Sequence, residues 1–261
     1  MEGTGEWMNQ LLIVAVAASR FGFAFVLVPI FAPDTIPAMV RNSVVITLGM
    51  VSYFMQPPFD PAEIGAFAWA RLLLKEAAVG LTIGFLFGAV MWALQAAGEL
   101  IDAKVGATIG QVTEPLGGSM TSLHGVLLGR LAQVIFASAG GILLLVGVVM
   151  ESYVLWPMGA DWPTLDASGL LVFETAFGHL MALVALFAVP VLVLLYVIDA
   201  GLGLLNRFAQ QLNVFAMSLS LKNWAATLMI ALLVPAFAQA VIGDLASRND
   251  QVRAIIQALG R

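Results

Sequence analysis

The chain has 261 residues, of which 61% are hydrophobic and only 10% are charged, and its formal net charge is −5. A soluble domain of this size is about half apolar and about a quarter charged, so this composition predicts an integral membrane protein. The acidic balance and the lack of any basic run argue against nucleic-acid binding. The absence of cysteine excludes disulfides, thiolate metal sites and cysteine nucleophiles.

Six apolar stretches predict an all-α fold of about six long helices, some of them broken. In chain order they are residues 11–31, 44–55, 67–97, 126–149, 177–198 and 224–242. The second is short for a membrane span, which needs about 20 residues, and the third is too long for one simple span. Proline-rich segments at 29–37, 56–61 and 156–166 predict a bend and two loops.

Three glycines recur at every fourth residue of the third stretch, at Gly80, Gly84 and Gly88. On a helix they form one smooth strip, which lets the backbone of another helix approach closely. Tight packing in an assembly and ordinary packing within one bundle both account for this strip. The spacing alone does not choose between them.

The third stretch ends in AGELIDAKVG, where Glu99 and Asp102 share a helix face. Paired carboxylates in a membrane relay protons or bind a cation. We favour a solvated polar helix end with Lys104 as the partner, because the apolar stretch ends here. No nucleophile or metal-ligand pattern accompanies them, so we expect no catalytic residue, no metal and no cofactor. His124 and His179 are lone histidines, for which we expect structural roles.

A glycine-rich segment, VGATIGQVTEPLGGSMTSLHG, lies between the third and fourth stretches. Such a segment beside membrane helices is a re-entrant loop only if protein or water shelters it. Its apolar and small residues argue against full solvation, so we expect a buried or gating loop. A disordered external loop is the alternative.

The most polar stretch of the chain is DAGLGLLNRFAQQLNVFAM, residues 199–217. On one continuous helix its polar residues form a narrow stripe, opposite a face of leucines and phenylalanines. Amides in an apolar assembly hydrogen-bond to neighbouring helices or to channel water, which favours an inward-facing helix. A helix on the membrane surface is the alternative, but such helices are usually rich in Lys and Arg. The stripe and its flanks comprise Asp199, Gly203, Asn206, Arg207, Gln210, Gln211, Asn213 and Met217.

Two motifs carry a family resemblance. DAGLGLLNRFAQQLNVFAMSLSLKN (199–223) resembles the most characteristic stretch of the type III secretion export-apparatus family, which comprises the T subunit of injectisomes and its flagellar counterpart. AGELID, followed by Gly106 and TEPLGGSMTS, is similar to its second signature. The apolar segments match over nearly the whole chain, so we expect one domain of this family over residues 1–261.

QLNVF followed by LK looks closer to the injectisome branch. Gln210 and Ser220 stand where relatives commonly have proline, which favours a straighter helix over 199–217.

This resemblance implies a subunit that is not an enzyme. It implies assembly with several copies of the small R and S subunits into a helical, pore-containing gate, through which unfolded proteins are exported. Further implied partners are the switch-type U subunit, the large V subunit, the inner rod at the needle base and membrane lipid. It also implies a multi-pass protein of the bacterial inner membrane, with the assembled helices largely above the membrane plane on the periplasmic side.

The resemblance also implies two sets of site residues. The glycine-rich loop matches the region that plugs the closed pore, with Gly106, Gly110, Pro115, Gly117, Gly118 and Met120. The second set packs or lines the gate, with Asp199, Asn206, Arg207, Gln210, Gln211, Asn213 and Lys222.

Other functions remain as alternatives. A flagellar-type gate subunit is the alternative within the family. A small-molecule secondary transporter is supported by the intramembrane residues Glu76, Pro190 and Asp199, although no inverted repeat accompanies them. A membrane-bound enzyme has only Glu99 and Asp102 as candidate residues.

Overall fold

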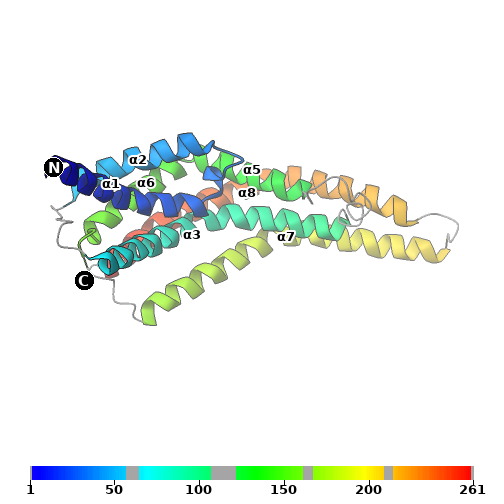
Figure 1. Cartoon of the computed structure of the whole chain (residues 1–261). Helices are drawn as coiled ribbons and strands as arrows, with labels where there is room; N and C mark the ends of the chain where they lie inside the picture. The colour runs from blue at the N-terminus through cyan, green and yellow to red at the C-terminus, as the bar shows by residue number, and fades with distance from the viewer. Residues whose placement is uncertain (1, 57–64, 107–121, 161–166, 209–213, 260–261) are drawn as a thin grey trace. The chain divides into compact units, whose positions relative to one another are not determined.

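The structure is a computed structural model, and it describes residues 2–56, 65–106, 122–160, 167–208 and 214–259. Within these ranges the chain forms seven α-helices, one short 3-10 helix and no strand (Figure 1). The expected all-α fold is confirmed. The elements are α1 (Glu2–Leu27), η1 (Pro29–Phe31), α2 (Ala38–Met55), α3 (Ala66–Val105), α5 (Leu123–Ser138), α6 (Gly141–Leu155), α7 (Ala167–Phe208) and α8 (Val214–Leu259).

Five of these helices are long and apolar enough to cross a membrane, and the bent pair α5–α6 makes a sixth if it counts as one span. The predicted fourth stretch is therefore broken. The break falls at Gly140, whose φ of 80° lies in the left-handed region that favours glycine. By contrast, α3 is one unbroken helix of 40 residues, longer than a simple span requires.

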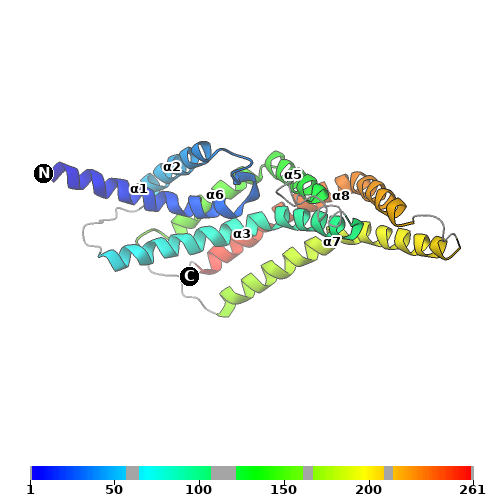
Figure 2. The ribbon, with the colours of Figure 1, turned by 45° about the vertical axis from the view of Figure 1, so that its right-hand side comes forward.

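The helix expected over residues 199–217 is not one helix. α7 ends at Phe208 and α8 begins at Val214, and the two lie side by side near this end in Figure 1 and Figure 2. The expectation of one continuous helix is therefore wrong, while Gln210, Gln211 and Asn213 of its polar stripe lie outside the described residues. Polar residues suit this place because α7 ends and α8 begins here, and the backbone groups at helix ends that lack intrahelical partners need other partners or water.

The described chain divides into two compact units, each assembled from separate parts of the sequence. Unit 1 comprises residues 1–89, 136–171 and 244–261, and unit 2 comprises residues 90–135 and 172–243. The helices α3, α5, α7 and α8 each contribute residues to both units. Each unit is described separately below.

In unit 1, α1 packs along α2, and both views show the two helices side by side (Figure 1, Figure 2). The contact is close because Gly49 of α2 meets Ala18 of α1, where an added Cβ would overlap the alanine. Phe21 and Phe25 of α1 are fully buried and meet edge to face, with ring centroids 6.3 Å apart. These contacts make α1 a core helix of unit 1.

The predicted glycine strip lies on the side of α3 that faces α1. A Cβ at Gly80 would overlap the carbonyl oxygen of Arg20, and a Cβ at Gly84 would overlap that of Ala24. Gly88 is also buried. At Gly80 and Gly84 the helix that approaches closely is therefore α1 of the same chain.

Unit 2 contains the second half of α3, most of α5, most of α7 and the first part of α8. Gly98 of α3 lies against the backbone of His124 and Gly125 in α5, where a side chain would not fit. Further along the unit, Phe187 of α7 and Phe237 of α8 pack edge to face, with ring centroids 5.3 Å apart. The first contact joins α3 to α5, and the second joins α7 to α8.

Candidate functional site

The carboxylate of Asp102, in the last turn of α3, is buried in unit 2. Only 4% of the residue is exposed. Oδ2 accepts hydrogen bonds from the Ser122 hydroxyl at 2.5 Å and from the His124 backbone N–H at 2.9 Å, and Oδ1 lies 2.5 Å from the His124 ring nitrogen Nδ1. A carboxylate at the first N–H groups of a helix is stabilised by the helix dipole. Asp102 therefore joins the end of α3 to the start of α5.

The start of α5 is shaped to receive this carboxylate. Ser122 precedes the first helical residue, and its Oγ accepts a hydrogen bond from the backbone N–H of Gly125 at 2.9 Å. This is an N-cap, which satisfies one of the free N–H groups at the helix start. Because Gly98 and Gly125 lack side chains, the two helix ends come close enough for these short bonds.

The His124 ring extends the contact to a third helix. Its Nε2 lies 3.0 Å from Oγ1 of Thr227 in α8, while Nδ1 faces Asp102. The Thr227 hydroxyl donates its proton to the carbonyl oxygen of Asn223 in its own helix, at 2.9 Å, and its oxygen faces the ring. Asp102, His124 and Thr227 thus form one hydrogen-bonded chain across α3, α5 and α8.

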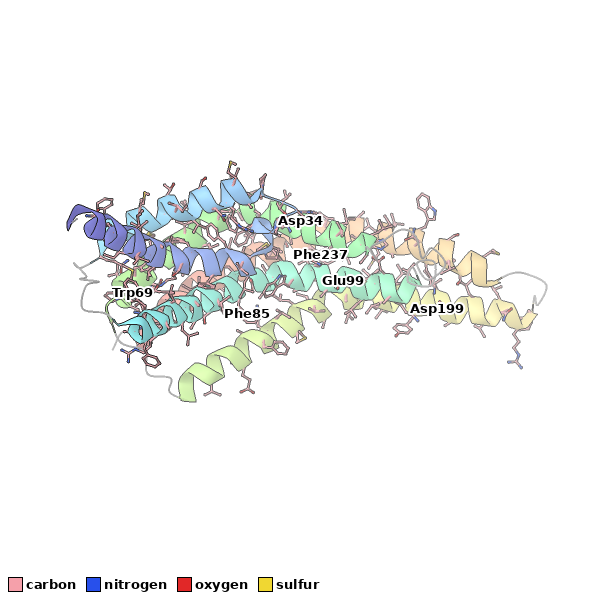
Figure 3. The ribbon with its side chains drawn as sticks, in the orientation of Figure 1. Asp34, Trp69, Phe85, Glu99, Asp199 and Phe237 are labelled. Atoms are coloured by element: carbon pink, nitrogen blue, oxygen red, sulfur yellow. The ribbon has the colours of Figure 1, made fainter. Side chains whose placement is uncertain are left out.

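A second polar contact starts from the same turn of α3. Lys104 Nζ lies 2.7 Å from Asp199 in α7, and Lys222 Nζ of α8 lies 3.2 Å from the same carboxylate. The ammonium of Lys104 also lies 3.9 Å from the ring centroid of Tyr196, a cation–π contact. Figure 3 labels Asp199 on α7. Asp199 and Lys222 therefore hold α7 and α8 to the end of α3.

The structure corrects the expectation for the end of the third stretch. Glu99 is exposed and accepts a hydrogen bond from Gln95, as expected of a solvated helix end. Asp102 is buried instead, and its partners are Ser122 and His124, not Lys104. Sequence spacing missed this contact because the partners lie 20 and 22 residues further along the chain.

Of the remaining predicted site residues, the structure describes only some. Gly106 directly follows α3 with a φ of 91°, a value that favours glycine after a helix end. Asn206 and Arg207 are exposed in the last turn of α7. The other predicted plug and gate residues lie outside the described residues: Gly110, Pro115, Gly117, Gly118, Met120, Gln210, Gln211 and Asn213.

A comparison with known families identifies the chain. The family described as "Bacterial export proteins, family 1" matches residues 11–247. The chain belongs to this family. This export protein is 31% identical over 225 residues to "Yop proteins translocation protein T" of Yersinia pestis, with 86% of each chain covered. It is 32% identical over 233 residues to "Secretion system apparatus protein SsaT" of Salmonella typhimurium, with 88% of each covered.

A flagellar relative is more distant. "Flagellar biosynthetic protein FliR" of Bacillus subtilis is 27% identical over 220 residues, with 84% of this chain and 83% of the relative covered. The resemblance read from the two motifs is confirmed. The export protein is thus a homologue of the T subunit of the type III secretion export apparatus, a multi-pass membrane protein of the inner membrane.

A second buried polar cluster of the export protein lies in unit 1. Arg20 of α1 binds Glu76 of α3 through two hydrogen bonds of 2.7 and 3.0 Å, and both residues are fully buried. Arg20 also donates to the Ser152 hydroxyl of α6 and to the carbonyl oxygen of Trp156. The transporter alternative used Glu76 as an intramembrane carboxylate, but here it is ion-paired with Arg20 and joins helices.

The neighbouring Lys75 holds the segment that follows α6. Its Nζ donates to the carbonyl oxygens of Pro157, Met158 and Ala160 at 2.8 to 3.0 Å. Three carbonyl groups around a buried ammonium replace the water that it would otherwise need. A signal for this cluster is present in the sequence, because Arg20, Lys75 and Glu76 interrupt apolar stretches. Only the tertiary structure shows which groups they bind.

Proposed function

We propose that this export protein is a subunit of a closed helical pore, built with the small R and S subunits, through which unfolded proteins leave the cytoplasm. The U subunit, the V subunit and the inner rod are its further partners in this proposal, and the assembled core protrudes to the periplasmic side. The proposal includes the plug, formed by the segment that starts at Gly106. Family membership and the two sequence motifs support the assignment of this chain as a subunit of the export apparatus.

The observation that carries the assembly step is the unequal burial of the apolar helices. In α3, 67% of the candidate span is buried within the chain, whereas the spans of α8 and α2 are 22% and 11% buried. Exposed apolar surface on this scale marks a contact with lipid or with another protein. Because the relatives are named as parts of translocation and secretion systems, we assign a large part of this surface to neighbouring subunits.

Native mass spectrometry of a tagged chain tests the proposal. The chain is co-expressed with the R and S subunits of its own operon and purified in mild detergent. We expect one large complex of fixed mass that contains a single copy of this chain. A lone chain, or a homo-oligomer without either partner, contradicts the proposal and returns the transporter to consideration.

A further inference from the structure

We propose that the end of unit 2 formed by the last turns of α7 and the first turns of α8 is a docking surface for another protein, outside the lipid. We call residues 200–208 and 217–221 the hairpin end. The partner that fits it is an apolar segment of a neighbouring subunit that carries a carboxylate opposite Arg207. The inference rests on the proposed function, which supplies the neighbouring subunit.

The first step is the length of the two helices. Their candidate spans are 35 and 31 residues long, whereas a bilayer crossing needs about 20 residues. Residues 175–198 of α7 and residues 223–243 of α8 contain no charged side chain, and each stretch has about the length of one crossing. Part of each helix therefore extends beyond the hydrocarbon layer.

The second step is a layer of charges that marks where the hydrocarbon ends. Asp199 of α7 binds Lys104 of α3 at 2.7 Å and Lys222 of α8 at 3.2 Å, so the three residues lie at one level of unit 2. The side chains of Asp199 and Lys104 are 32% and 25% exposed, whereas both partners of the buried pair in unit 1 are 0% exposed. Exposed charges are costly in hydrocarbon, so this level lies in water or among lipid headgroups.

The third step is a pair of aromatic residues beside this layer. Tyr196 lies within one turn of Asp199, and its ring is 3.9 Å from the Lys104 ammonium. Trp224 lies within one turn of Lys222, and both aromatic residues are exposed. Each belongs to the uncharged stretch of its helix, and Tyr and Trp are enriched where hydrocarbon meets headgroups. The aromatic residues and the charges thus mark the same boundary.

The fourth step is the apolar surface beyond this boundary. Both views show α7 and α8 continuing side by side past the last turn of α3 (Figure 1, Figure 2). An exposed apolar patch that lies outside the hydrocarbon marks a contact with protein. The exposed large apolar residues of the hairpin end are Leu204, Leu205, Phe208, Met217 and Leu221.

The fifth step is the charge of the partner. Arg207 is the only charged residue between positions 200 and 221, and it is exposed in the same turn as Leu204. None of the ion pairs found among the described residues includes Arg207. Charges of opposite sign across an apolar contact select the partner and fix its register. A segment with an acidic residue at this place therefore fits the hairpin end better than a basic one.

Cysteine labelling tests whether the hairpin end lies outside the lipid. The chain has no cysteine, so Leu204→Cys and Leu186→Cys each report one position of α7, on opposite sides of the charged layer. The two leucines are matched, at 63% and 58% exposed. The lone chain is placed in liposomes, with a charged maleimide on both faces of the membrane. We expect Leu204→Cys to react at least ten times faster than Leu186→Cys, and equal rates overturn the boundary.

Substitutions test the docking. The chain is co-expressed with the R, S and U subunits, and native mass spectrometry measures the assembled fraction. We expect Leu204→Gln and Arg207→Glu to lower this fraction several-fold, while the lone chains melt like the wild type. The controls Leu204→Met and Arg207→Lys keep the apolar surface and the charge, so they assemble like the wild type.

The outcomes separate this inference from the proposed function. Assembly of Leu204→Gln at the wild-type level overturns the docking surface, and assembly of Arg207→Glu at that level overturns the acidic partner. If the wild type itself does not assemble, the proposed function fails. The labelling of the lone chain still decides whether the hairpin end lies in water.

Discussion

Buried charges are rare in membrane helices, and three of those in the described part of this chain, Arg20, Lys75 and Glu76, are held by an opposite charge or by carbonyl groups. The guanidinium of Arg20 makes four hydrogen bonds, two of them to Glu76, and lies over the Tyr153 ring at 3.9 Å. Tyr153 in turn donates to the carbonyl oxygen of Ala17. This cluster joins α1, α3 and α6, so its role in unit 1 is structural.

Removing one partner of the Arg20–Glu76 pair should therefore destabilise unit 1 strongly. An uncompensated buried charge costs about 3–5 kcal/mol, so we expect Glu76→Leu to reduce the free energy of unfolding by that amount. The double variant Arg20→Met with Glu76→Leu should recover a good part of the loss, because no charge is stranded. Thermal melting in detergent measures both.

The control for this experiment is Glu99→Gln. Glu99 is exposed, so the melting temperature should change little. A melting temperature of Glu76→Leu equal to that of the wild type would show that the Arg20–Glu76 pair does not stabilise the chain. A double variant less stable than Glu76→Leu would show that Arg20 matters mainly through Ser152 and Trp156.

At the scale of elements, small residues decide which helices can approach each other. Gly80 and Gly84 admit the α1 backbone, Gly49 admits Ala18, and Gly98 admits the start of α5. Without these glycines the polar side chains of neighbouring turns would not reach their partners. Close packing of membrane helices depends on such positions, because lipid supplies no hydrophobic force between helices.

We expect opposite effects from alanine at two helical glycines. Gly84→Ala places a methyl group against the carbonyl oxygen of Ala24, so the variant should lose about 1–3 kcal/mol despite the better helix propensity. Gly147→Ala, in α6, meets nothing within 4 Å and should gain up to about 1 kcal/mol.

Melting temperatures of the two purified variants check this prediction. Equal stability of Gly84→Ala and Gly147→Ala would show that α1 and α3 are not in close contact in the folded chain. The comparison is matched because both substitutions are identical and both lie within unit 1.

At the scale of the whole molecule, the described parts of the later helices expose many large hydrophobic side chains. On α8, Leu228 and Leu232 are 63% and 68% exposed, whereas Ala226 and Ile230 are buried. The alternation at helical spacing gives α8 one face that packs inside unit 2 and one that does not. A protein with such a face needs lipid or subunits around it.

Cysteine labelling distinguishes these two surroundings. In detergent, we expect Leu232→Cys to react quickly with a maleimide in the lone chain and much more slowly after assembly with the R and S subunits. Ile230→Cys should react slowly in both. Equal labelling of Leu232→Cys before and after assembly would assign this face to lipid.

The sequence alone determined the membrane class, the all-α fold and the family, because composition, long apolar runs and short motifs are local properties. It also marked Gly80 and Gly84 as positions of close approach. What the tertiary structure alone decided is which groups meet. Asp102 was expected to be solvated, yet it binds residues 20 and 22 positions away, and the expected helix over 199–217 divides into two. Both outcomes depend on where helices end and turn back, and a local periodicity does not contain that information.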